Sequence, residues 1–238
     1  MLAVFLVIAT TLGGFSYHVV ALSDRTKSVK TAPPGYAPTW KEHVETIVAT
    51  DPKDADFSRF MRGQAIRLQR DYYGGGSAGE AGSFEKNTDA GWVEVSETIL
   101  SASPDVVSVS IGTGFYQAGM AHPNVQGSRT YIWSRRLHRL LTQADVFEVP
   151  PDRALRRIAQ ARFDNQENLF PADAPDGIPL DWDHASIGPD GITWSFGPYE
   201  LGGYLSAGDA TLTWSDLKPY LRRKLPFVAS TIRISGGR

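Results

Sequence analysis

The sequence contains no cysteine, and this absence excludes several kinds of chemistry at once. The chain has no disulfide bonds, no thiolate nucleophile and no cysteine-ligated metal site. It also has little excess charge of either sign, because 24 basic and 26 acidic residues leave a net charge of −2. A balance this close to neutral gives no electrostatic reason to expect binding to nucleic acid or to an anionic membrane surface.

The signatures of common catalytic and metal sites are missing as well. The glycine-rich segment 74–91 is not followed by the Gly-Lys-Ser/Thr of a phosphate-binding loop. The Asp-Trp-Asp-His cluster at Asp181–His184 has neither the His-Glu-x-x-His spacing of a zinc hydrolase nor the spacing of a calcium loop. We therefore expect no metal, no cofactor and no catalytic residues, and we interpret the cluster as a solvated loop.

Long hydrophobic runs are also lacking, and the run Leu2–Ala9 at the N-terminus is short. A helix that crosses a membrane needs about 20 mostly apolar residues. A short apolar core followed by small residues predicts a secretory signal, with Val19–Ala21 as a cleavage site, or a retained anchor. The departure from this pattern is that no lysine or arginine precedes Arg25. We expect an exported protein of the periplasm or cell envelope, which touches the membrane only through this segment if the segment is not cleaved.

Changes in composition predict five segments along the chain. They are a signal peptide or N-terminal anchor (1–23), a proline-bearing linker (24–38), an N-terminal helical region (39–91), an α+β domain (92–226) and a C-terminal tail (227–238). Within the third segment, Asp56–Tyr72 carries apolar residues at helical spacing, and Asp54 or Asp56 is a possible cap. Trp40–Ala49 fits a strand or a helix equally well.

Strand patterns dominate after Trp92. The segments Trp92–Leu100, Val106–Ile111 and Ser128–Trp133 have short connections, which favours an antiparallel meander. The alternation in Val106–Ile111 predicts a strand with one buried face. Further expected elements are helices at Asp152–Phe163 and Asp216–Leu221, strands at Ile192–Phe196 and Ala210–Trp214, and a last strand or loose tail at Phe227–Ile234. The predicted fold class is α+β, an antiparallel β-sheet (meander) covered by helices.

Three short motifs occur in this order along residues 92–226. They are Gly-Met-Ala-His-Pro-Asn at Gly119–Asn124, Leu-Thr-Gln-Ala-Asp-Val-Phe at Leu141–Phe147, and Trp-Ser-Phe-Gly-Pro-Tyr-Glu at Trp194–Glu200 followed by Tyr204, Gly208 and Thr211–Leu221. This arrangement resembles the RsiV-like C-terminal domain, a bacterial envelope domain of unknown function. One departure is Gly197, which stands where that family favours asparagine.

The resemblance implies a helix-covered α+β fold and a place in the cell envelope. RsiV-like domains occur in anti-sigma factors that sense lysozyme, and they accompany some peptidoglycan deacetylase domains. The partner implied for this chain is therefore a lysozyme-like protein or peptidoglycan.

The candidate binding residues lie in the first and third motifs. They are His122, Asn124, Tyr199, Glu200 and Tyr204. His122 and Asn124 suit either a turn whose backbone they hydrogen-bond or a ligand contact. Glu200 suits either a buried acid with a raised pKa or an anchor that accepts backbone N–H bonds.

Three functions remain open from the sequence. The first is a non-catalytic binding or sensing module. The second is an enzyme, or an enzyme-accessory domain, that acts on cell-wall glycan through His122 with Glu200 or Asp183. The third is a structural envelope protein without a ligand. Aromatic residues in or near the predicted sheet offer a surface for stacking sugars, although core packing explains most of them equally well: Tyr116, Tyr131, Trp133, Trp182, Trp194, Tyr199 and Tyr204.

Overall fold

The computed structural model describes residues 10–32, 34–35, 37–74, 89–118, 124–164, 177–197, 200–201 and 207–234. The chain forms two compact units, each made of three segments. The first unit takes Thr10 and the described residues of Tyr17–Glu97 and Ile111–Gln126, and the second takes Thr11–Ser16, Thr98–Ser110 and those of Gly127–Arg238. Each unit therefore draws residues from both sides of the boundary expected near residue 91.

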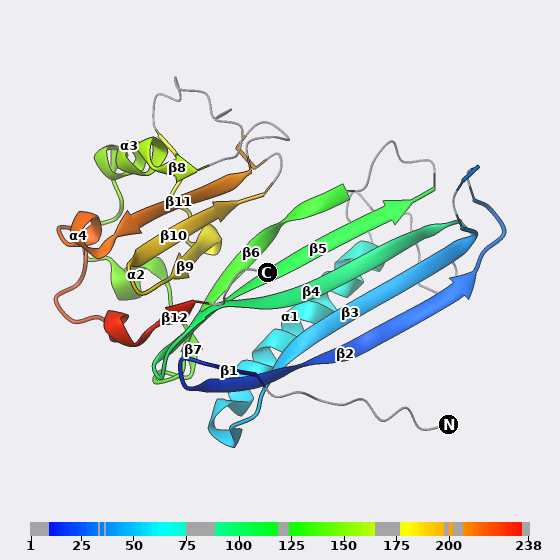
Figure 1. Cartoon of the computed structure of the whole chain (residues 1–238), viewed down its shortest axis with the longest axis horizontal. Helices are drawn as coiled ribbons and strands as arrows, with labels where there is room; N and C mark the ends of the chain where they lie inside the picture. Colours follow the sequence, from blue (N-terminus) through cyan, green and yellow to red (C-terminus); the bar gives the residue numbers. More distant parts are fainter. Residues whose placement is uncertain are drawn as a thin grey trace. The chain divides into compact units, whose positions relative to one another are not determined.

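The larger sheet has eight strands, and seven of them follow one another in sequence order (Figure 1). These are β1 (Thr10–Leu12), β2 (Phe15–Ser28), β3 (Thr39–Ala49), β4 (Gly91–Ala102), β5 (Val106–Gln117), β6 (Asn124–Ser134) and β7 (Arg139–Leu140), and β12 (Arg233–Ile234) pairs with β4. β2 and β3 are antiparallel, whereas β3 and β4 are parallel. The parallel pair needs a crossover connection, and the connection contains α1 (Ala55–Gly74).

A second, antiparallel sheet lies within the second unit. Its strands are β8 (Phe163–Asp164), β9 (Ala185–Ile187), β10 (Gly191–Phe196) and β11 (Gly208–Thr213), in the order β8-β11-β10-β9. The same unit contains the helices α2 (Gln143–Val146), α3 (Arg153–Ala161) and α4 (Trp214–Leu217), and the 3₁₀ turns η2 (Trp182–His184) and η4 (Ala229–Thr231). η1 (Pro52–Asp54) precedes α1 in the first unit.

In the first unit, α1 packs its apolar face against β3 (Figure 1). Phe57, Met61 and Ala65 recur every four residues and are fully buried. On β3, Trp40 and Val44 alternate with exposed or half-buried residues and are also fully buried. The predicted amphipathic helix thus finds its partner in the segment whose structure the sequence left undecided.

The core of the second unit gathers residues from both of its sheets and from its helices. It includes Val106, Ile132, Leu141, Val146, Phe147, Leu155, Ala159, Ile178, Leu180, Ala185, Ile187, Ile192, Trp194, Phe196, Ala210, Leu212, Leu217, Phe227 and Ile232. α3 begins at an Asp152 cap whose carboxylate accepts a bond from Leu155 N at 2.9 Å. Its buried residues Leu155 and Ala159 share one face, and the helix packs on β11.

A two-residue turn, Gly13-Gly14, joins β1 to β2. Both glycines have positive φ (55° and 77°), as a type I′ hairpin turn requires. A Cβ on Gly13 would lie only 2.1 Å from Ala102 O, so a larger residue does not fit there. Phe15 follows the turn, is fully buried and stacks beneath the guanidinium of Arg135 at 5.2 Å.

The α+β class with a mainly antiparallel sheet is confirmed, but several details differ from the expectations. Instead of a single sheet there are two, with α1 packed on β3 of the larger sheet and α3 packed on β11 of the second. Residues 39–91, expected to be mainly helical, begin with the strand β3, so the undecided segment Trp40–Ala49 is a strand, and 24–28 of the expected linker belong to β2. β2 also contains Val19–Ala21, the expected cleavage site.

The prediction that only one face of Val106–Ile111 is buried is also wrong. Ser108, on the face expected to be exposed, is fully buried. Its hydroxyl accepts a hydrogen bond from Ile187 N at 3.1 Å, so β9 of the second sheet covers that face. A serine can lie there because a backbone donor satisfies its oxygen.

Other differences concern the ends of elements. The second helix ends at Ala161, and Phe163 belongs to β8. The third begins at Trp214 behind a Thr213 cap, before the predicted start at Asp216. Residues 227–234 form η4 and the short strand β12. Of the helices that the structure describes, none combines the length and the apolar character needed to cross a membrane.

Candidate functional site

An open groove in the second unit is lined by residues from three elements. β6 contributes Thr130, Tyr131 and Ile132, β7 and the residue after it contribute Leu140 and Leu141, and η2 with its cap contributes Asp181, Trp182 and Asp183. Its volume is about 500 Å³, within the range of small-ligand sites. Its lining combines apolar side chains, two aromatic rings and two carboxylates, which makes this groove a candidate site among the described residues.

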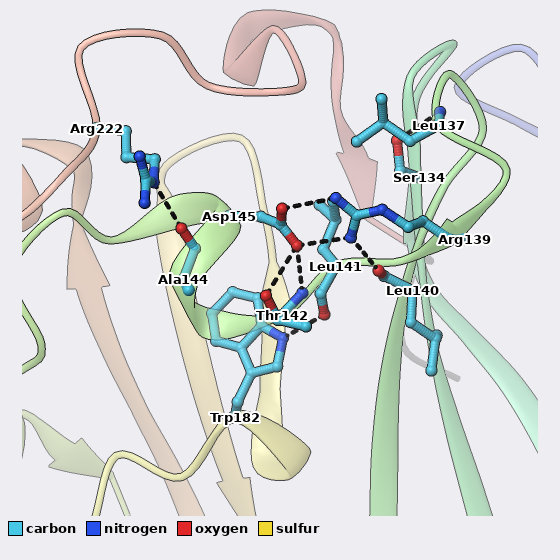
Figure 2. Close-up of polar contacts among 10 residues, drawn as sticks. All are labelled: Ser134, Leu137, Arg139, Leu140, Leu141, Thr142, Ala144, Asp145, Trp182 and Arg222. Carbon is cyan, nitrogen blue, oxygen red and sulfur yellow. Dashed lines mark hydrogen bonds and ion pairs between the residues drawn. The ribbon is translucent and has the colours of Figure 1, made fainter.

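The side chain of Trp182 is held by one hydrogen bond and one aromatic contact. Its indole Nε1 donates a hydrogen bond to Leu141 O at 2.7 Å, as Figure 2 shows. Phe147 meets the indole edge-on, with ring centroids 6.1 Å apart and an interplanar angle of 87°. A half-buried ring fixed in this way is ready to contact a ligand, because little side-chain entropy remains to be lost on binding.

The backbone that receives the indole is itself locked by Asp145. This carboxylate forms a bidentate ion pair with Arg139, with N–O distances of 2.7 and 2.8 Å, and accepts bonds from Thr142 N and Thr142 Oγ1 at 2.8 and 2.9 Å (Figure 2). These bonds close a capping box at the start of α2. The hydrogen bonds from Arg139 and Thr142 hold the pKa of Asp145 well below its ordinary value.

Replacing Asp145 with asparagine is expected to lower the free energy of unfolding at neutral pH by about 1–2 kcal/mol, because the ion pair and part of the capping box are lost. Since the folded-state pKa is depressed, this contribution is present above the ordinary value of 3.8 and disappears as the pH falls below it. Chemical denaturation at neutral and acidic pH measures both effects.

The matched control is Asp56→Asn on α1. Asp56 also pairs with an arginine, Arg59, at 2.6 Å, but both side chains are at least half exposed. Such a pair contributes less than about 1 kcal/mol. Equal losses for the two variants would contradict the structural role given to Asp145.

A second polar cluster surrounds His184, directly after the groove residue Asp183. His184 Nδ1 lies 3.5 Å from Glu200 Oε2, and Nε2 lies 3.9 Å from Asp183 Oδ1. The imidazole also stacks on Phe196, with centroids 5.1 Å apart. Both ring nitrogens therefore lie near carboxylates, but neither contact is a hydrogen bond, and Nδ1 is buried without a hydrogen-bond partner among the described residues.

Comparison with solved structures finds proteins of the same fold. A DUF3298-family protein from Pseudomonas aeruginosa aligns over 87% of this chain and 94% of its own, with a TM-score of 0.60 and 14% identity. A member of the DUF3298 family from Bacteroides fragilis aligns over 90% of this chain and 96% of its own, with a TM-score of 0.56 and 13% identity. The chain shares the DUF3298 fold.

Sequence comparisons add nothing to this likeness. No family model matches the chain, and no curated protein matches it. The DUF3298 family is a domain of unknown function, so the likeness extends to the fold alone.

The structure describes two of the five candidate binding residues predicted from the sequence, Asn124 and Glu200. His122, Tyr199 and Tyr204 fall outside the described residues, and Asn124 is described only as the first residue of β6. Glu200 is described: its Oε2 accepts a bond from Gly197 N at 2.7 Å, which anchors the loop after β10. The histidine beside Glu200 is His184, which the sequence analysis placed in a solvated loop.

The groove residues were visible in the sequence but were not selected. Tyr131 and Trp182 belonged to the set of aromatic residues near the sheet, and Asp181 and Asp183 to the cluster taken as a solvated loop. What the sequence did not reveal is that η2 lies beside β6 and β7 in the fold. Within the described residues, no group of histidine, aspartate or glutamate side chains is arranged to hold a metal ion.

Proposed function

We propose that this chain is an exported, non-catalytic binding or sensing module of the bacterial cell envelope, an RsiV-like version of the DUF3298 fold. The groove around Trp182 is its ligand surface. The family resemblance implies a lysozyme-like protein or peptidoglycan as the ligand. The apolar run at the N-terminus supports export, because its length suits a secretory signal.

The observation that carries this proposal is the preorganised Trp182 in an open groove. Tryptophan and tyrosine are enriched in recognition surfaces, since a rigid ring offers a large contact area at a low entropic cost. Tyr131 and Trp182 both line the groove, and Trp182 is fixed by Leu141 O and Phe147. The hydrogen bonds that link Asp145 to Arg139 and Thr142 fix the backbone next to Leu141, which accepts the indole N–H (Figure 2).

Retention of the purified chain on immobilised lysozyme and on isolated peptidoglycan tests the proposal. The expected result is that the wild-type chain is retained on one of them and that Trp182→Ala abolishes the retention. Trp214→Ala is the matched control. Trp214 is also half-buried, donates its indole N–H to a backbone carbonyl (Pro189 O, 2.7 Å) and packs on a phenylalanine, Phe227, but it lies outside the groove.

Retention on neither ligand would remove the implied partners. An equal loss for both tryptophan variants would remove the groove as the binding surface. Release of soluble fragments from peptidoglycan, lost in His184→Ala, would favour the enzymatic alternative over the binding module.

A further inference from the structure

We propose that the groove binds a cationic group, a lysine or arginine side chain presented by a partner protein, between Asp181 and Asp183 and against Trp182. The inference rests on the proposed function, in which this groove is the ligand surface. Of the eight lining residues, two are acidic and none is basic. The charge of the lining therefore complements a cation.

Neither of these carboxylates is engaged in holding the fold together. Asp181 occupies the N-cap position of η2 without forming a side-chain capping bond. Its carboxylate makes no hydrogen bond or ion pair within the part of the chain that the structure describes, whereas its backbone carbonyl accepts a bond from His184 N at 3.2 Å. The contact of Asp183 is the long one, 3.9 Å, to His184 Nε2, and its side chain is 56% exposed.

Three other aspartates of the same unit are engaged in the fold. Asp152 caps α3 and accepts a bond from Tyr220 Oη at 3.0 Å. Asp216 closes the capping box of α4 and pairs with Arg162. Asp145 binds Arg139 and Thr142. Asp181 and Asp183 differ from these three, since they line one groove and their carboxylates make no hydrogen bond within the described residues.

Two arginines of the same unit are already hydrogen-bonded within the fold. Arg139 immediately precedes the lining residue Leu140, but its guanidinium is bound to Asp145 and to Leu140 O at 2.8 Å (Figure 2). Arg222 donates its Nε–H to Ala144 O. Because both guanidiniums are bound elsewhere, neither of these two arginines is paired with Asp181 or Asp183.

Trp182 provides a second interaction that favours a cation. An ammonium or guanidinium over an indole face gains cation–π energy, and tryptophan is the best aromatic partner for it. Carboxylates add charge-assisted hydrogen bonds to the same group. A neutral glycan would use the ring but would gain nothing from the net charge of the groove, so the lining favours a basic protein segment.

The test uses the full chain and two defined probes, a capped hexalysine peptide and the neutral sugar chitohexaose. Trp182 fluorescence, assigned by difference from Trp182→Phe, and calorimetry report binding. We expect the peptide to bind and salt to weaken the binding. Asp181→Asn with Asp183→Asn should weaken it by about tenfold or more, as the loss of two charge contacts implies.

The double variant Asp190→Asn with Asp209→Asn is the matched control. It removes the same charge from exposed aspartates of the same unit that do not line the groove, and peptide affinity should remain as in the wild type. An equal loss of peptide affinity in this control would show that binding depends on the overall charge of the protein and not on the groove, and would overturn the inference.

Two further outcomes separate this inference from the proposed function. Chitohexaose binding that depends on Trp182 but not on the two aspartates would keep the groove as a ligand surface and overturn the cationic ligand. If the groove variants leave every interaction unchanged, for the peptide, the sugar, lysozyme and peptidoglycan alike, both proposals fail.

Discussion

Replacing Glu97 with glutamine should raise the free energy of unfolding by about 2–3 kcal/mol at about pH 8 and change it little at about pH 4. Glu97 lies on β4 between Val95 and Ile99 and is only 3% exposed. Its Oε2 accepts hydrogen bonds from Ile47 N at 2.7 Å and from Thr46 Oγ1 at 3.1 Å. Its Oε1 is buried without a hydrogen-bond partner among the described residues.

The direction of the effect follows from the pKa of this carboxyl. Burial raises the pKa to about 7 from an ordinary value of 4.5, against the lowering effect of the bonds from Ile47 and Thr46, and nearby Glu45 raises it further. Between these two values the unfolded chain holds fewer protons than the folded protein, so the free energy of unfolding falls as the pH rises. Glutamine is neutral at every pH and removes this loss.

Glu42→Gln is the control, with the opposite expected sign. Glu42 is also buried in the first unit, at 1% exposure, but its Oε1 lies 2.7 Å from the guanidinium of Arg25 and also accepts a bond from Ser23. Removing its charge weakens the ion pair with Arg25 and lowers stability at about pH 8. Denaturant titrations at both pH values measure the two variants. Destabilisation by Glu97→Gln at the higher pH would mean that the folded protein carries Glu97 ionised.

Local signals along the chain predicted many of the elements. The Asp152 cap and the apolar spacing after it predicted α3, and the alternation in Ile192–Phe196 predicted β10. Such signals act between residues a few positions apart, so one sequence contains them completely. The α+β class follows from them, because strands with buried faces and amphipathic helices must cover one another.

Long-range pairing was not predictable in the same way. The alternating pattern of β10 and β11 is compatible with any sheet, and the separate four-stranded sheet arises only because β8 and β9 pair with them. The parallel pairing of β3 with β4 depends on the crossover through α1, which no local pattern encodes. The groove has the same origin, since Trp182 reaches Leu141 across 41 positions of sequence.

One local signal was present but was interpreted differently. Gly13-Gly14, flanked by Thr10–Leu12 and by the β-prone residues from Phe15 onward, is a hairpin signal. The sequence analysis took these glycines as the end of an apolar run because that run suggested a secretory signal. The two interpretations make different predictions for Phe15.

Phe15→Ala is expected to lower the free energy of unfolding by about 3–5 kcal/mol, the usual cost of truncating a fully buried phenylalanine. Phe15 is 0% exposed, and Arg135 lies over its ring. The same guanidinium donates to Gly14 O at 3.3 Å and to Ser103 O at 3.2 Å, so the hairpin turn and the β4–β5 connection share one arginine. Loss of the ring opens a cavity at the point where these contacts meet.

Val19→Ala, on the same strand but 46% exposed, is the matched control and should cost less than about 1 kcal/mol. Cleavage at Val19–Ala21 would remove Phe15 together with the residues from Tyr17 to Ala21 that pair with β3. A large loss for Phe15→Ala beside a small one for Val19→Ala would place Phe15 in the folded core, so any N-terminal cleavage would have to occur before Phe15. Equal small losses, with a mature N-terminus after Ala21 measured by mass spectrometry, would instead make this hairpin part of a removed signal.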